Sequence, residues 1–156
     1  MSEVRRAVEA HVRSEPGVHF NELTRDLDIA TGQAQYHLRR LVDAGDVVTE
    51  RLRDRTHYFP AEYDAWERRT LALLRRETTR EIIATALEDP KPAAADLAAD
   101  LDVARSTISW HLSTLESTGV AETTYDSLGR VHVSLTDPEG TRRLLGEVEP
   151  TWPDRL

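Results

Sequence analysis

The amino-acid sequence predicts a mainly α-helical chain with two small β-hairpins, built as two tandem copies of one unit. The first observation is a repeated phrase, because LDIATGQAQYHLRRLVDAG at residues 27–45 returns as LDVARSTISWHLSTLESTG at residues 101–119. The second is that each phrase contains an amphipathic helical pattern that stops at a glycine. The third is a pair of short β-prone stretches after each glycine. Two copies within 156 residues favour two small domains.

The repeat is clearest where residues 23–45 are aligned with residues 97–119. The nine identities are Leu23/Leu97, Asp26/Asp100, Leu27/Leu101, Asp28/Asp102, Ala30/Ala104, His37/His111, Leu38/Leu112, Leu41/Leu115 and Gly45/Gly119. A repeat at a fixed distance indicates two copies of one supersecondary unit. The paired acids at positions 26/28 and 100/102 are most simply explained as solvated side chains.

The first copy begins with a charged helix over residues 2–14, in which Val4, Val8 and Val12 recur at helical spacing. The dipeptide Pro16-Gly17 ends this helix. Asn21 is expected to cap a short helix over residues 22–28.

After a turn at residues 29–32, a longer helix is expected from residue 31 to residue 44, and Gly45 stands where a helix end favours a left-handed residue. Residues 47–53 and 55–59 then predict a hairpin with a charged tip.

The second copy repeats this order. Thr78 and Glu81 have the spacing of a capping box at the start of a helix that ends before Asp89-Pro90. The remaining expected elements are a short helix over residues 94–100, a longer helix over residues 106–118 stopped by Gly119, and strands over residues 121–125 and 130–135.

The expected domains are residues 1–60 and 77–137, joined by a linker helix over residues 61–76 and followed by a short C-terminal helix and tail over residues 138–156. One side of the linker helix carries a mostly apolar stripe, namely Tyr63, Trp66, Thr70, Leu73 and Leu74. This stripe favours a homodimer formed through the linker helix, and the alternative is that it is buried between the two copies of one chain.

Helix, short helix, turn, long helix and hairpin are the parts of a winged helix-turn-helix unit. Residues 94–119 (AADLAADLDVARSTISWHLSTLESTG), and likewise residues 20–45, resemble the helix-turn-helix of ArsR- and MarR-like transcriptional regulators, in the paired-domain form common in archaea. The resemblance covers nearly the whole chain except the tail, and it implies a regulator that binds double-stranded DNA. One departure is Ala30 and Ala104, where relatives usually carry a capping serine; Thr31 and Ser106 are the replacement caps to expect.

The two long helices, over residues 31–44 and 106–118, share a core face but not an outer face. Helical geometry places Tyr36 and Trp110 opposite the apolar core positions, which are Ala34, Leu38 and Leu41 in the first copy and Ile108, Leu112 and Leu115 in the second. The expected DNA-reading neighbours of the two rings are Gln33, Gln35, Arg39 and Arg40, and Arg105, Ser106, Thr107, Ser109 and Ser113. Gln pairs bidentately with adenine and Arg with guanine in the major groove. The alternative is that each ring packs on its own wing or on the linker helix.

The charge pattern separates the two copies. Residues 1–60 hold nine basic and ten acidic side chains, whereas residues 61–156 hold 11 and 18. The first hairpin concentrates arginines at Arg51, Arg53 and Arg55, of which Arg53 and Arg55 are expected to contact DNA, as is Arg130 in the second hairpin. Acidic excess with a single lysine, Lys91, resembles proteins from very salty cytoplasm and indicates a halophilic archaeal source; GC-rich coding alone explains arginine over lysine, but not the acidity.

Other functions are disfavoured by what the sequence contains. With no cysteine, disulfides and thiolate metal sites are excluded, and no histidine pair has metal-ligand spacing, so we expect no cofactor and no metal. His37 and His111 are expected to bond a nearby carbonyl or turn, and His57 and His132 to hold a shared structural position. No catalytic constellation is visible, so we expect no enzyme.

Two alternatives to a DNA-binding regulator stay open. Winged helices also serve as non-catalytic protein–protein modules in larger transcription or chromosome complexes. RNA binding is the weaker alternative, because no aromatic platform is visible. No apolar stretch approaches the ~20 residues that span a bilayer, and no signal peptide precedes the first helix, so the sequence predicts a soluble cytoplasmic protein without a membrane partner and with no evident small-molecule ligand.

Overall fold

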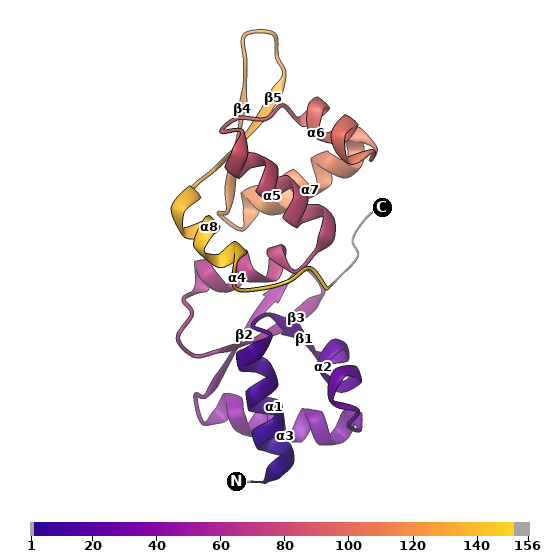
Figure 1. Cartoon of the computed structure of the whole chain (residues 1–156), viewed down its shortest axis with the longest axis vertical. Coiled ribbons are helices and arrows are strands. Elements are labelled where there is room, and N and C mark those ends of the chain that lie inside the picture. Colours follow the sequence, from indigo (N-terminus) through magenta and orange to yellow (C-terminus); the bar gives the residue numbers. More distant parts are fainter. Residues whose placement is uncertain (1, 152–156) are drawn as a thin grey trace. The chain divides into compact units, whose positions relative to one another are not determined.

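The computed structural model describes residues 2–151 (Figure 1). The chain divides into two compact units, Met1–Ala72 and Leu73–Leu156. Their helices are α1 (Glu3–Ser14), α2 (Phe20–Leu27), α3 (Thr31–Asp43), α4 (Ala65–Leu74), α5 (Glu77–Glu88), α6 (Ala94–Leu101), α7 (Arg105–Ser117) and α8 (Pro138–Leu145). Their strands are β1 (Val18–His19), β2 (Val47–Leu52), β3 (Arg55–Pro60), β4 (Ala121–Tyr125) and β5 (Val131–Leu135). The predicted class is confirmed: the chain is mainly helical, with small antiparallel sheets in two helix-turn-helix units.

The first unit adds a strand that the sequence did not predict. Its antiparallel sheet has the order β1-β3-β2, and β1 contributes only Val18 and His19, which pair with Tyr58 and His57. A strand of two residues has no periodicity to detect, so only the tertiary pairing reveals it. The second unit keeps one trace of this strand, an isolated bridge between Ala93 and His132.

The core of the first unit is formed by the predicted faces of α1 and α3. Val8 and Val12 are fully buried, and they pack in one cluster with the α3 residues Ala34, Leu38 and Leu41. In the second unit the equivalent α7 residues are also buried, namely Ile108, Leu112 and Leu115. Since burial of one leucine side chain contributes about 1.5–3 kcal/mol, these inner faces hold each long helix in place.

The helix starts differ from the predictions at several caps. His19, rather than Asn21, caps α2, because its Nδ1 accepts a hydrogen bond from the backbone N–H of Glu22 at 3.4 Å. Ala30 and Ala104 are the N-caps of α3 and α7, and neither helix start has a side-chain cap. The expectation that Thr31 and Ser106 replace the missing serine is therefore wrong.

The capping box also lies at a different place. Helix α5 begins at Glu77 without a side-chain cap, and Thr78 is buried inside the helix. The reciprocal pair of hydrogen bonds instead occurs before α4, where the Asp64 carboxylate accepts from the Glu67 N–H at 2.8 Å and the Glu67 carboxylate accepts from the Asp64 N–H at 2.9 Å. The capping-box signature at positions 78 and 81 misled because the helix had already started.

Left-handed residues end the helices of both units at equivalent places. Gly45 and Gly119 follow α3 and α7 with φ of +81° and +79°, as predicted. Asp28 and Asp102 follow the short helices α2 and α6 with φ of +52° and +53°. Short polar side chains tolerate this conformation better than most, so these two aspartates are helix terminators and not merely solvated acids.

The linker helix α4 is shorter than the expected range 61–76, and the C-terminal helix α8 ends at Leu145. Helix α8 begins at Pro138, and the Asp137 side chain caps it by accepting from the N–H of Gly140 at 3.0 Å. In α4, Thr70, Leu73 and Leu74 are fully buried, whereas Trp66 is half-buried. Between residues 2 and 151, no helix combines the length and apolar character that crossing a bilayer requires.

Candidate nucleic-acid interface

The outer face of α3 carries the polar side chains predicted to read DNA. The side chains exposed on this face are Gln33, Gln35, Tyr36, Arg39 and Arg40, and Tyr36 is 55% exposed. Among the described residues, neither Arg39 nor Arg40 forms an ion pair. The helix therefore presents two uncompensated guanidinium groups and two amides to solvent.

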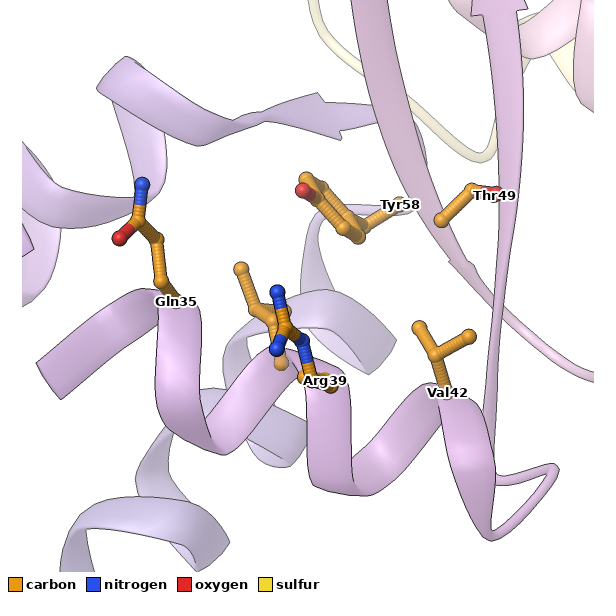
Figure 2. A pocket seen from close by; sticks show the side chains of 6 residues that line it. Gln35, Arg39, Val42, Thr49 and Tyr58 are labelled. Carbon is orange, nitrogen blue, oxygen red and sulfur yellow. The ribbon is translucent and has the colours of Figure 1, made fainter. Parts of the chain in front are cut away.

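A groove separates this face of α3 from the first hairpin (Figure 2). Gln35, Arg39 and Val42 rise from the helix toward Thr49 of β2 and Tyr58 of β3, and the groove has a volume of about 380 Å³. Partial burial raises the pKa of the Tyr58 phenol, so this side chain stays a neutral hydrogen-bond donor at neutral pH. Two of the predicted reading residues, Gln35 and Arg39, thus line one wall of an open groove, and the wing forms its other wall.

The second unit repeats the groove with a different lining. Its volume is about 200 Å³, and Ser109 and Ser113 occupy the positions equivalent to Gln35 and Arg39. Glu116 stands where the first copy has Val42, and its carboxylate accepts a hydrogen bond from the Thr123 hydroxyl at 2.8 Å. A carboxylate in this groove repels phosphate, so the second groove is less suited to a DNA backbone than the first.

The outer face of α7 agrees with the prediction except at one residue. The exposed residues on this face include Arg105, Ser106, Ser109 and Ser113, with Trp110 39% exposed. Thr107, which was expected to point outward, is only 7% exposed. It lies one residue before the core position Ile108 and turns toward the interior, so it is not available as a reading residue.

The tip of the first hairpin is a two-residue turn, Arg53-Asp54, between the paired residues Leu52 and Arg55. Arg53 adopts φ +54°, a left-handed conformation that glycine normally occupies in such turns. Arg51, further back on β2, donates a hydrogen bond to the Thr56 hydroxyl at 3.3 Å. The three exposed arginines of the first wing therefore lie at or close to its tip.

The second hairpin projects from the helices of its own unit (Figure 1). Its arginine, Arg130, forms an ion pair within the hairpin. The Nε of Arg130 donates to the Asp126 carboxylate at 2.9 Å, and Asp126 also accepts from the backbone N–H groups of Leu128 and Arg130 at 2.8 and 3.0 Å. Tyr125 and Leu128 beside it are 74% and 77% exposed. The second wing thus offers a neutralised charge and apolar surface where the first wing offers arginines.

A histidine on the second strand of each wing bonds an equivalent backbone carbonyl, which agrees with the shared structural position predicted for His57 and His132. His57 bonds the carbonyl of Gly17 through Nδ1 at 2.7 Å, and His132 bonds the carbonyl of Lys91 through Nδ1 at 3.0 Å. Gly17 and Lys91 are equivalent positions of the repeat. His132 differs because its Nε2 also lies 2.8 Å from the Asp126 carboxylate. Both ring nitrogens of His132 therefore face acceptors, which raises its pKa. The hydrogen bond from His132, together with those from the backbone N–H groups of Arg130 and Leu128, holds the pKa of Asp126 far below its usual range.

This arrangement predicts a pH-dependent second wing. Protonated His132 stabilises the hairpin below its ordinary pKa of 6.5, and this contribution is lost as the pH rises through the raised value. The Asp126 carboxylate contributes above its ordinary pKa of 3.8 and loses this only at lower pH, so the pair is strongest between pH 3.8 and pH 6.5. Asp126→Asn is expected to lower the pKa of His132 in an NMR titration, because the acceptor carboxylate is lost and no longer offsets the Arg130 charge, which disfavours protonation. An unchanged pKa of His132 in Asp126→Asn would contradict this assignment.

The histidines of the two long helices are buried, and a side chain of the first helix in each unit contacts one ring nitrogen. His37 and His111 are 7% and 2% exposed. The Nε of Arg5 donates to His37 Nδ1 at 3.3 Å, and the Thr79 hydroxyl lies 3.5 Å from His111 Nδ1. Both of these contacts come from side chains on the first helix of the unit, α1 for His37 and α5 for His111. No cluster of three or more potential metal ligands occurs within residues 2–151.

Comparisons with known proteins agree with this architecture. Residues 2–71 match a family model described as an N-terminal HTH domain, and residues 75–122 match one described as winged helix-turn-helix DNA-binding. An uncharacterized HTH-type transcriptional regulator of Methanocaldococcus jannaschii is 27% identical over 122 residues, which is 78% of this chain. The chain spans only 31% of the length of that relative.

Two solved structures show weaker likeness. HlyU from Vibrio cholerae is 21% identical with a TM-score of 0.46, over 51% of this chain and 85% of its own. A chain of the ESCRT-II endosomal trafficking complex is 14% identical with a TM-score of 0.35, over 90% of this chain and 63% of its own. Because both scores lie below 0.5, neither likeness bears on function. The two family models and the repeated architecture show that the chain carries two helix-turn-helix domains in tandem, the second of them a winged helix-turn-helix DNA-binding domain.

Proposed function

We propose that the protein is a sequence-specific transcriptional regulator that inserts α3 into the major groove of double-stranded DNA. The observation that carries the proposal is the outer face of α3, where exposed Gln35 and Arg39 line a groove beside an arginine-tipped hairpin. An α-helix fits the major groove, and amide and guanidinium groups there pair bidentately with adenine and guanine. Arg53 and Arg55 at the hairpin tip then contact phosphates or the adjacent minor groove.

The acidic character of the chain is compatible with this role. Of the formal net charge of −8, only −1 belongs to residues 1–60, so the acidic excess lies mainly outside the reading helix and its wing. If the source is halophilic, counterion release contributes little to binding in its cytoplasm, and base contacts carry more of the affinity. Binding is accordingly to be measured in concentrated potassium chloride as well as in dilute salt.

The proposal is tested by selecting bound sequences from random double-stranded DNA and measuring the affinity for the selected sequences at several salt concentrations. Wild-type protein is expected to enrich one motif, and a variant with Arg39→Ala and Arg40→Ala is expected to lose that preference. Genome-wide occupancy of the tagged protein then checks whether the motif lies at promoters. Failure of the folded wild-type protein to enrich any motif would favour the non-catalytic protein–protein module instead.

A protein-binding contribution of the second domain is a second candidate. It is favoured by exposed Tyr125 and Leu128 at a wing tip whose arginine is tied to Asp126. On this proposal the second domain positions the first or binds a partner, and Arg105, Ser106, Ser109, Trp110 and Arg130 contribute little to base reading.

We further propose that the regulator acts as a homodimer through α4, since a two-fold dimer reads a palindromic site. Leu73 and Leu74 are fully buried within the chain, so on α4 the contact must rely on Trp66. Tyr63, expected on the linker helix, lies just before α4 and is half-buried like Trp66. Light scattering in high salt is expected to give twice the chain mass, and Trp66→Ala is expected to reduce it. A monomeric mass that does not change when DNA is added would overturn the dimer.

A further inference from the structure

One side chain of α1 contacts two consecutive residues of the reading helix. The Nε of Arg5 donates to His37 Nδ1 at 3.3 Å, and the guanidinium carbon of Arg5 lies 5.8 Å from the centre of the Tyr36 ring. The rings of Tyr36 and His37 meet edge to face, with centroids 5.1 Å apart. Both distances are within the range of favourable cation–π and aromatic contacts. Arg5, His37 and Tyr36 therefore form one small cluster, here called the Arg5 cluster.

His37, the buried member of the Arg5 cluster, anchors the Arg5 side chain. His37 is 7% exposed, and its burial together with the Arg5 charge lowers the pKa of its imidazole below 6.5. The ring is consequently neutral at neutral pH, and its Nδ1 can accept the Arg5 hydrogen bond. Arg5 is thus held by a buried neighbour while its guanidinium lies against the exposed Tyr36.

The outer member is the one that faces solvent. Tyr36 is 55% exposed on the same helix face as Gln35 and Arg39. An exposed aromatic side chain without lateral contacts is able to sample several rotamers. Restricting it to one rotamer when DNA binds costs conformational entropy and weakens base recognition. A guanidinium against the ring favours one orientation over the others.

The repeat supplies an internal comparison. The residues equivalent to Arg5, Tyr36 and His37 are Thr79, Trp110 and His111. The Thr79 hydroxyl reproduces the contact with the histidine at 3.5 Å, but a threonine is too short and carries no charge with which to hold the indole in the same way. The histidine contact is therefore common to both copies, whereas the cation at this position belongs only to the first.

We infer that Arg5 is a positioning residue, which sets the orientation of Tyr36 on the outer face of α3 and thereby sharpens the base preference of the first domain. The inference rests on the proposed function. It extends the reading apparatus from α3 to α1, although Arg5 acts through Tyr36 and not on the bases.

The test compares Arg5→Thr, which copies the second domain, with Arg6→Thr, which removes the same charge from the neighbouring exposed position. Arg5→Lys keeps the charge and serves as the conservative variant. Each protein is measured for affinity on a set of single-base substitutions of the selected site and for the salt dependence of binding. NMR of the Tyr36 ring in the DNA-free protein reports the orientation directly.

Arg5→Thr is expected to lose about two- to fivefold in discrimination, the equivalent of one exposed cation–π contact. The loss should fall at the base positions affected by Tyr36→Ala, and the double variant should be no worse than Tyr36→Ala alone. Arg5→Lys should recover part of the loss, and Arg6→Thr should keep the wild-type preference. The Tyr36 ring resonances should shift in Arg5→Thr but not in Arg6→Thr.

Other outcomes overturn the inference in distinct ways. Uniform weakening with a shallower salt dependence in Arg5→Thr would make Arg5 a phosphate contact. A loss of stability without a change in base preference would make it only a structural residue. Unchanged Tyr36 resonances in Arg5→Thr would overturn the inference alone, whereas wild-type protein without any base preference would overturn the proposed function and the inference with it.

Discussion

Replacing Gln35 and Arg39 together with alanine is expected to abolish the base preference of the protein, while Ser109→Ala with Trp110→Ala costs less than about tenfold in affinity. The expectation follows from the chemistry of the two grooves. Each good bidentate base contact is worth about 1–3 kcal/mol of discrimination, and a hydroxyl contact discriminates less. Gln35 and Arg39 are able to make two bidentate contacts, whereas their equivalents Ser109 and Ser113 can make none.

The surroundings of the two pairs point in the same direction. Arg39 forms no ion pair within residues 2–151, so its charge is available to DNA. In the second groove Glu116 contributes a carboxylate, and residues 61–156 hold an excess of seven acidic side chains. The first domain should therefore supply most of the specificity.

The measurement is a competition between the selected site and its single-base variants, with thermal unfolding as a check on stability. Alanine at exposed helix positions is expected to change the free energy of unfolding by less than about 0.5 kcal/mol, so lost preference can be assigned to lost contacts. If the Ser109/Trp110 pair proves more damaging at equal stability, the second copy is the main reader and the assignment is reversed.

Changing Arg53 and Arg55 together to alanine is expected to weaken binding to all sequences about equally. Two phosphate contacts correspond to a decrease of about 1.8 in the slope of log affinity against log salt. The base preference should stay as it is in the wild type, because contacts with the backbone position the protein but do not read sequence. Binding isotherms at several salt concentrations measure both quantities.

Arg130→Ala is the matched control in the second wing. Its guanidinium already forms an ion pair with Asp126 at 2.9 Å, so its removal should change the salt dependence little. A changed base preference with an unaltered salt slope in the Arg53/Arg55 variant would instead assign these arginines to base reading.

The sequence by itself determined the duplicated unit and the faces of its long helices. Periodicity was sufficient to place Leu38 and Leu41 in the core and Tyr36 outside, because an amphipathic helix buries whichever stripe is apolar. Gly45 and Gly119 marked the helix ends for an equally local reason, since their positive φ angles disfavour other residues. These features depend on neighbours close in the sequence.

Only the tertiary structure decided which side chains meet across the fold. The hydrogen bond from Arg5 to His37 joins residues 32 positions apart. The ion pair between Arg130 and Asp126 depends on the conformation of the hairpin turn that lies between them. The two-residue strand β1 exists only because Val18 and His19 pair with β3. Such contacts leave no periodic pattern, because they depend on distances between elements and not on spacing within one. For this reason the sequence predicted a recognition helix and a wing, while the structure revealed the contact of Arg5 with Tyr36 and that of Arg130 with Asp126.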